Sequence, residues 1–149
     1  MNITITQAET LPVEIKELAK QAHKEGLVLV DGLIEEYESG KNRFNQPGEF
    51  LLFAYDDDRL IACGGLNQQW NENEIDTRIG RVRRFYVLLK YRKHGVGKQL
   101  LQHLEKQARA NFSALCLSID TKAAASFYQK QNYVFVENHP NYSYFKYLL

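Results

Sequence analysis

Long apolar runs are missing from the 149-residue chain, and so is any large net charge. No apolar run approaches the roughly 18 residues of a membrane-spanning helix. The opening residues, MNITITQAET, lack the apolar core of a signal peptide. We therefore expect a cytoplasmic protein that has no membrane partner. A formal net charge of +1, with a quarter of the residues charged, argues against a polybasic nucleic-acid-binding protein.

Cysteine is scarce as well, with two residues in the whole chain. Cys63 and Cys116 each lie in an apolar, strand-like run and form no C-x-x-C pair, which predicts buried thiols in a reducing compartment. The three adjacent aspartates at 56–58 separate two apolar runs. We interpret them as a solvated hairpin turn, because no further residues are spaced as metal ligands. No metal cofactor is expected.

The length corresponds to one domain, which we place at residues 1–149. Alternating apolar residues predict strands, and apolar residues three and four apart predict helices. The strands are expected at residues 2–7, 49–55, 60–66, 82–89, 114–120, 134–137 and 142–148. The helices are expected at residues 10–26, 31–39, 96–108 and 122–131, the first capped by Thr10 and the last by Asp120 or Thr121. The polar segments 41–48 and 67–77 are expected to be loops.

The stretch from Gly80 to Phe112 carries the most informative pattern in the chain. A strand rich in valine, leucine and aromatic residues leads into a basic turn that contains Gly95 and Gly97, and a helix with one apolar stripe follows. The first amides of that helix have no intrahelical partner, and the macrodipole adds about half a positive charge there. Strand, glycine turn and helix together predict a site for a pyrophosphate group.

The spacing in this turn excludes two common phosphate loops. The dinucleotide fingerprint requires a third glycine where Leu100 stands. The nucleoside triphosphate loop requires serine or threonine after Gly97-Lys98, and Gln99 follows instead. What remains is R-x-x-G-x-G over residues 92–97, preceded by Phe-Tyr-Val at 85–87. This pattern resembles the acyl-coenzyme A loop of the GNAT superfamily of N-acetyltransferases, with a plain glycine turn as the alternative on the loop alone.

A second segment, residues 121–133, strengthens the resemblance. Its sequence, T-K-A-A-A-S-F-Y-Q-K-Q-N-Y, is similar to the second GNAT signature, in which asparagine is followed by alanine, Phe-Tyr and a Gly-Phe turn. Ala124 and Phe127-Tyr128 match in register. Thr121 stands in place of the asparagine, and Asn132-Tyr133 in place of Gly-Phe. The two motifs therefore occur in the order that the family shows.

The resemblance implies an α/β (α+β) fold, with a mixed, mostly antiparallel, twisted sheet of six to seven strands and helices on both faces. It implies an N-acetyltransferase that moves an acetyl group from acetyl-coenzyme A to a primary amine by direct attack in a ternary complex. Tyr128 would protonate the leaving sulfur, and the Val87 amide would face the thioester oxygen. The residues implied to bind the cofactor are Phe85, Tyr86, Val87, Arg92, Lys93, His94, Gly95, Val96, Gly97, Lys98 and Thr121.

The resemblance identifies neither the general base nor the acceptor. Many relatives carry a glutamate at positions that correspond here to Arg81 or Arg83. One hypothesis is deprotonation through water, or by Glu74 or Asp76. A second is that Arg81, Arg83 or Arg84 binds a carboxylate or phosphate on the acceptor. Both a small-molecule amine and a peptide amine stay open as the acceptor. A homodimer stays open as the oligomeric state, and a non-catalytic acyl-coenzyme A sensor or interaction module stays open as the alternative function.

Overall fold

The computed structural model describes residues 1–71, 74–119 and 121–149, with the backbone alone at residues 71 and 74–77. The strands are β1 (Ile3–Gln7), β2 (Phe50–Asp56), β3 (Arg59–Asn71), β4 (Glu74–Val87), β5 (Ala114–Leu117), β6 (Val134–Phe135) and β7 (Tyr144–Tyr147). The helices are α1 (Ile15–Lys24), α2 (Leu29–Ser39), α3 (Val96–Ala108) and α4 (Lys122–Lys130), with a 3-10 turn, η1 (Leu89–Tyr91).

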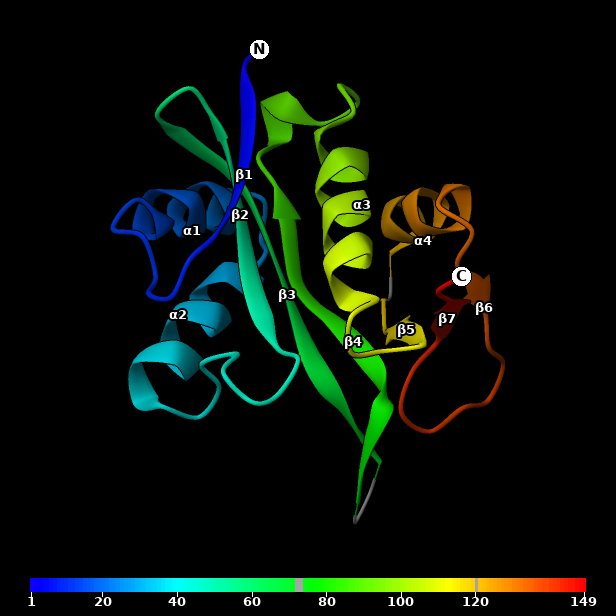
Figure 1. Cartoon of the computed structure of the whole chain (residues 1–149). Helices are drawn as coiled ribbons and strands as arrows, with labels where there is room; N and C mark the ends of the chain where they lie inside the picture. The colour runs from blue at the N-terminus through cyan, green and yellow to red at the C-terminus, as the bar shows by residue number, and fades with distance from the viewer. Residues whose placement is uncertain (72–73, 120) are drawn as a thin grey trace.

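The strands form one sheet in the order β1-β2-β3-β4-β5-β7-β6. Neighbouring strands are antiparallel except β4 and β5, which are parallel. Helices α1 and α2 lie on one side of the sheet, and α3 and α4 lie on the other (Figure 1). The expected fold class, a mixed and mostly antiparallel sheet with helices on both faces, is confirmed.

Local sequence signals place most helix ends correctly. The residues of α3 match the predicted span because its apolar stripe, which includes Val96, Leu100 and Leu104, is buried against the sheet. Gly40 ends α2 in the left-handed conformation, with φ of +82°. At the start of α4, the Thr121 hydroxyl accepts a hydrogen bond from the Ala124 amide at 3.2 Å. The alternative cap, Asp120, lies outside the described residues.

Two sequence-based boundaries are wrong. The first helix begins at Ile15 after Glu14, not near Thr10, since a residue that precedes proline, here Leu11 before Pro12, is biased away from helical geometry. The expected loop at residues 67–77 is strand on both sides of residues 72–73. Polar residues hid this strand from the sequence pattern, because Asn67 and Gln69 are buried there, 7% and 1% exposed, with polar partners.

Strand β4 contains one more residue than β3 at a bulge. Gly65 pairs with Arg83 and Cys63 pairs with Tyr86, so Gly64 alone lies opposite Arg84 and Phe85. Arg84 adopts a φ of +55°, a left-handed conformation that costs a residue with a side chain about 1 kcal/mol or more. Its carbonyl accepts a hydrogen bond from the Cys63 thiol at 3.3 Å.

The bulge reverses the side-chain alternation of β4. On the α2 side, Arg83 and the inserted Arg84 both approach Glu36. On the opposite side, Phe85 packs over Gly64, and Val87 lies beside Gly97 of α3. Cationic side chains and apolar side chains of one short segment are thereby sorted to different faces of the sheet.

A buried ion pair joins α3 to β7. Glu105 is 5% exposed, and both of its oxygens accept hydrogen bonds from Lys146 Nζ, at 3.0 and 3.1 Å. The Tyr133 hydroxyl donates to the same carboxylate at 2.8 Å. The Tyr133 ring in turn packs edge-on against Tyr128, with centroids 5.4 Å apart. The ion pair therefore supports the position of Tyr128.

Lys146→Met is expected to lower the free energy of unfolding by about 3 kcal/mol, because it leaves the Glu105 charge buried without its ionic partner. Urea unfolding monitored by circular dichroism measures this loss. The matched control is the double variant Glu105→Gln with Lys146→Met, which removes both charges and should recover most of the lost stability. Equal stability of the single and double variants would contradict a buried ion pair.

Candidate active site

A gap opens between β4 and β5 because the two strands pair over a short length. The parallel ladder joins Ile79–Arg81 to Ala114–Cys116, whereas β4 continues to Val87. The Leu88 amide donates to Ile61 of β3 at 2.8 Å. Because successive amides of a strand point to opposite edges, the Val87 amide points toward the β5 side, into the gap. This is the orientation that the predicted contact with a thioester oxygen requires.

The loop after β4 presents backbone amides at the start of α3. Gln99 makes the first helical hydrogen bond, to the Gly95 carbonyl at 3.0 Å, so the amides of residues 96–98 precede the helical ladder. Lys93 and Gly95 both adopt left-handed conformations, with φ of +66° and +82°. Exposed side chains surround this turn, namely Lys93, His94 and Lys98. Amides, macrodipole and cations together suit an anion.

Not every predicted cofactor residue can contribute its side chain. Val96 is 1% exposed and packs into the core, and Tyr86 is 3% exposed, so these two residues can offer a ligand their backbone groups only. At Gly97, an added Cβ would lie 3.2 Å from the Phe127 ring. Glycine at this position therefore keeps the start of α3 close to α4, and Thr121 contributes to the arrangement by capping α4.

Arg92 holds the loop to the C-terminal end of α1. Its guanidinium makes a two-pronged ion pair with Glu25, at 2.7 and 2.9 Å, and its Nε donates to the Val87 carbonyl at 2.9 Å. The Tyr86 hydroxyl donates to the same carboxylate at 2.5 Å. Arg92 thus bridges the loop, α1 and the last residue of β4, and we refer to these contacts as the Glu25–Arg92 clamp.

Four aromatic rings lie together on the α3 and α4 side of the gap. Phe85 and Phe127 have centroids 5.9 Å apart, and Tyr128 contacts Phe85, Phe127 and Tyr133 edge-on. Burial raises the pKa of the Tyr128 hydroxyl well above its usual range. Within the described part of the chain, that hydroxyl makes no hydrogen bond. A buried, protonated hydroxyl with spare donor capacity is suited to a general acid.

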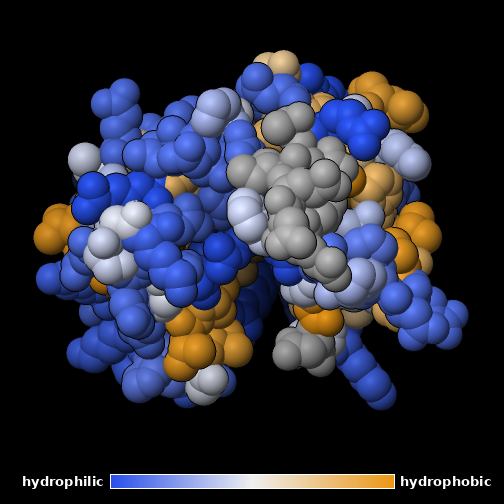
Figure 2. Space-filling view, turned by 90° about the horizontal axis from the view of Figure 1, so that it is seen from below, coloured by the Kyte–Doolittle hydropathy of each residue, from blue (hydrophilic) through white to orange (hydrophobic). Residues whose placement is uncertain are grey.

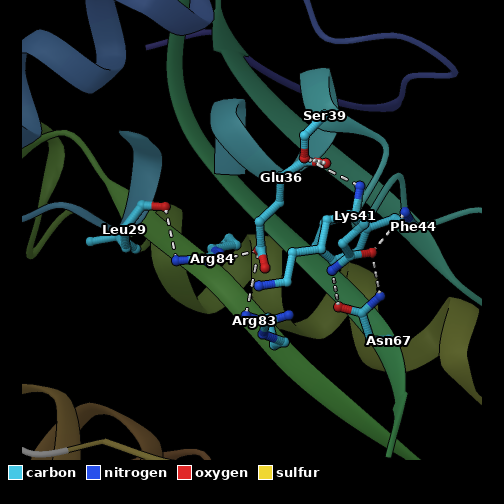
Figure 3. A network of polar contacts seen from close by, with 9 residues as sticks. Leu29, Glu36, Ser39, Lys41, Phe44, Asn67, Arg83 and Arg84 are labelled. Atoms are coloured by element: carbon cyan, nitrogen blue, oxygen red, sulfur yellow. Dashed lines mark hydrogen bonds and ion pairs between the residues drawn. The ribbon is translucent and has the colours of Figure 1, made fainter. Parts of the chain in front are cut away.

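The three strand arginines have different surroundings, and Figure 3 shows those of Arg83 and Arg84. Arg81 donates to the Asn141 carbonyl at 2.7 Å and to the Ser118 hydroxyl at 3.0 Å. Arg84 donates to Glu36 at 2.6 Å and to the Leu29 carbonyl at 3.4 Å. Arg83 lies 3.6 Å from Glu36. Positions 81 and 83, where the resemblance implies a glutamate, are thus occupied by guanidinium groups that are partly buried.

Glu36, the carboxylate in contact with Arg83 and Arg84, is a poor candidate for a general base. Burial alone would raise the pKa of Glu36, but the hydrogen bond from Arg84 and the charges of Arg83, Arg84 and Lys41 outweigh it and hold this pKa below its usual range. The side chains of Glu74 and Asp76, the two acids predicted from the sequence, lie outside the described residues. The base therefore stays unidentified.

Sequence patterns did not single out Glu25, Glu36 or Lys41. Glu36 and Arg84 are 48 positions apart, and Glu25 and Arg92 are 67 apart, so no local period relates them. The sequence placed Glu36 in an expected helix and Lys41 in an expected loop, without relating either residue to β4. Reciprocal amide hydrogen bonds between Asn42 and Asn67, at 2.9 and 3.0 Å, attach that loop to β3.

Comparison with known proteins shows what this chain is similar to. The sequence model of the GNAT acetyltransferase family matches residues 14–133. The N-acetyltransferase YsnE of Bacillus subtilis, itself uncharacterized, is 31% identical over 88 residues, which are 59% of this chain and 54% of YsnE. The aligned region therefore spans about half the length of that relative.

Solved structures share the fold across the whole chain. A protein assigned as an acetyltransferase from Exiguobacterium sp. 255-15 is 26% identical, with a TM-score of 0.84 over 99% of this chain and 94% of its own. The GNAT N-acetyltransferase YhbS of Escherichia coli, solved in complex with CoA, is 15% identical, with a TM-score of 0.74 over 100% of this chain and 83% of its own. At this lower identity the likeness concerns the fold alone.

Two further observations concern the described residues as a whole. None of the helices there has the length and apolar character that a bilayer span requires. In the same residues, no three His, Cys, Asp or Glu side chains gather as ligands for a metal ion. Both predicted thiols are buried, and burial raises the pKa of Cys63 to about 12.

The buried tyrosines predict how stability depends on pH. Burial raises the pKa of Tyr128, and burial together with Glu105 raises that of Tyr133, whereas an unfolded chain releases these protons near pH 10. Stability from these groups is therefore complete below about pH 10 and is lost as the pH rises further. Urea unfolding between pH 8 and 11 should show this decline, and Tyr128→Phe should make it less steep. Tyr147→Phe, at a position that is 71% exposed, should leave the slope unchanged, and an equal effect of both changes would contradict the assignment.

Proposed function

Because the chain belongs to the GNAT acetyltransferase family, and is an acyltransferase by family, we propose that it transfers an acetyl group from acetyl-coenzyme A to a primary amine. The observation that supports this proposal is the gap between β4 and β5, together with the free amides at the start of α3 and the contact of Tyr128 with Phe85 of β4. The complex of YhbS with CoA supports the choice of donor.

The residues of the loop fit the phosphate groups of this donor. The amides of residues 96–98 would hold the pyrophosphate, with Lys93, His94 and Lys98 adding charge around it. The backbone of residues 85–87 would hold the pantetheine arm along the open edge of β4. Arg92 is engaged in the Glu25–Arg92 clamp, so we assign it the role of positioning the loop.

Bound acetyl-coenzyme A supplies a thioester that a neutral amine can attack. The Val87 amide would stabilise the negative charge that develops on the carbonyl oxygen, an oxyanion-type role. The Tyr128 hydroxyl would donate its proton to the sulfur that leaves, and its raised pKa keeps that proton available at neutral and moderately alkaline pH. The amine proton would leave through water, or to Glu74 or Asp76.

Acetyl-coenzyme A is expected to stabilise the folded protein, whereas NADH and ATP are not. A ligand present at a hundred times its dissociation constant adds about 2.7 kcal/mol, which corresponds to roughly 5 to 10 °C in the unfolding midpoint of a domain of this size. Thermal unfolding with each ligand measures the effect. A larger shift with NADH or ATP would contradict the donor assignment. A shift with acetyl-coenzyme A but no thiol release with any amine would favour the sensor alternative.

Tyr128→Phe is expected to lower kcat about 100-fold, because it removes the proton donor and leaves the ring in place. The dissociation constant for acetyl-coenzyme A, measured by calorimetry, should stay within about twofold of the unchanged protein. A role in packing alone would instead weaken binding and leave kcat nearly unchanged. Tyr55→Phe, on β2 away from the gap, is the matched control and should leave both constants unaltered.

A further inference from the structure

Positive charge is concentrated on the α2 side of β4. Arg83, Arg84 and Lys41 surround the single carboxylate of Glu36 (Figure 3), which leaves an excess of two positive charges in this cluster. Glu49 also attracts Arg83, and when its charge is counted one positive charge remains in excess. Among the described residues, the cluster therefore has more cationic groups than carboxylates.

The three strand arginines differ in how many of their donors are already used. Arg84 is fixed by Glu36 and the Leu29 carbonyl, and Arg81 by Gln69, Ser118 and Asn141. The 3.6 Å separation between Arg83 and Glu36 is longer than a hydrogen bond. Among the described residues, Arg83 donates no hydrogen bond, although its side chain is 31% exposed. Its planar set of donors is therefore available to an anion that arrives from outside.

The charge around Arg83 favours the arrival of such an anion. Burial lowers the pKa of Arg83, and repulsion from Arg84 and Arg81 lowers it further, beyond what Glu36 and Glu49 restore. A carboxylate or phosphate placed between these guanidinium groups would relieve that repulsion. Seen from below, the described part of the surface is mostly hydrophilic, with hydrophobic residues in separate patches (Figure 2).

The position of Arg83 relative to the gap limits the size of that ligand. Arg83 and Val87 lie opposite Gly65 and Ala62 of β3, which are three residues apart, or roughly 10 Å along that strand at about 3.3 Å per residue. The Val87 amide marks the place proposed for the thioester, and Arg83 lies on the side of α2. A small molecule with an amine at one end and an anionic group at the other can reach both.

We infer that the acceptor is a small amine that carries a carboxylate or phosphate, and that Arg83 is the residue that selects it. This inference rests on the proposed acetyl transfer and narrows its substrate class. Arg84 and Glu36 act as positioning residues, because they fix the bulge and the charge around Arg83 without offering it a hydrogen bond.

Paired substrates test this inference. Acetylation of 4-aminobutyrate is compared with that of its amide, and acetylation of phosphoethanolamine with that of ethanolamine, by kcat/KM. The anionic member of at least one pair should be favoured tenfold or more, as expected for a charge-assisted, two-pronged contact. The pair that shows the preference distinguishes a carboxylate from a phosphate.

Substitution of Arg83 then assigns that preference. Arg83→Gln should reduce it at least tenfold, mainly through KM, and leave kcat/KM for the neutral amines within about twofold. Arg83→Lys keeps the charge but loses the planar donor set, so an intermediate preference is expected. If Arg83→Gln does not fold, the Arg83→Lys result decides. Lys20→Gln on the exposed face of α1 removes the same charge at a remote position and should change nothing.

The possible failures can be told apart. Equal kcat/KM for anionic and neutral amines, or a preference that survives in both Arg83 variants, would overturn the inference and leave the proposed acetyl transfer intact. If no amine is acetylated, calorimetric titration of the CoA-saturated protein with 4-aminobutyrate and phosphoethanolamine replaces kinetics, and absence of binding overturns the inference. Absence of acetyl-coenzyme A binding overturns the proposed function itself.

Discussion

The single extra residue in β4 decides which face of the sheet each neighbouring side chain reaches. Without the bulge, the regular alternation of the same sequence would place Phe85 and Val87 on the same side as Arg83. With the bulge, Phe85 lies on the side of α3 and α4, and the guanidinium groups of Arg83 and Arg84 lie beside α2. The left-handed backbone at Arg84 is unfavourable, and its contacts with Glu36, Leu29 and Cys63 offset that cost.

Two cationic regions lie on a chain whose net charge is only +1. The start of α3 gathers amides and exposed basic side chains, and the α2 side of β4 gathers three cations around one carboxylate. Net charge describes solubility and long-range attraction, whereas binding depends on local potential. The near-neutral composition argues against a polybasic protein, yet it does not reveal these two regions.

The parts of the fold that depend on residues near one another in the chain can be predicted from the sequence. The span of α3 follows from its apolar stripe, and the end of α2 follows from Gly40. The extension of β3 does not, because Asn67 and Gln69 are buried with polar partners. The loop and Tyr128 come from recognisable motifs, whereas the Glu36 cluster depends on contacts between distant segments. Strand β4 is so polar that its sequence shows no clear alternation of apolar and polar residues. The bulge cannot be recognised from that sequence, and the role of Arg84 appears only in the structure.

The Glu25–Arg92 clamp connects the first helix to the loop at the start of α3. The same guanidinium contacts the Val87 carbonyl and Glu25, although Glu25 and Arg92 are 67 positions apart. The position of the loop relative to the sheet therefore depends on how the first helix packs, as well as on the sequence of the loop itself.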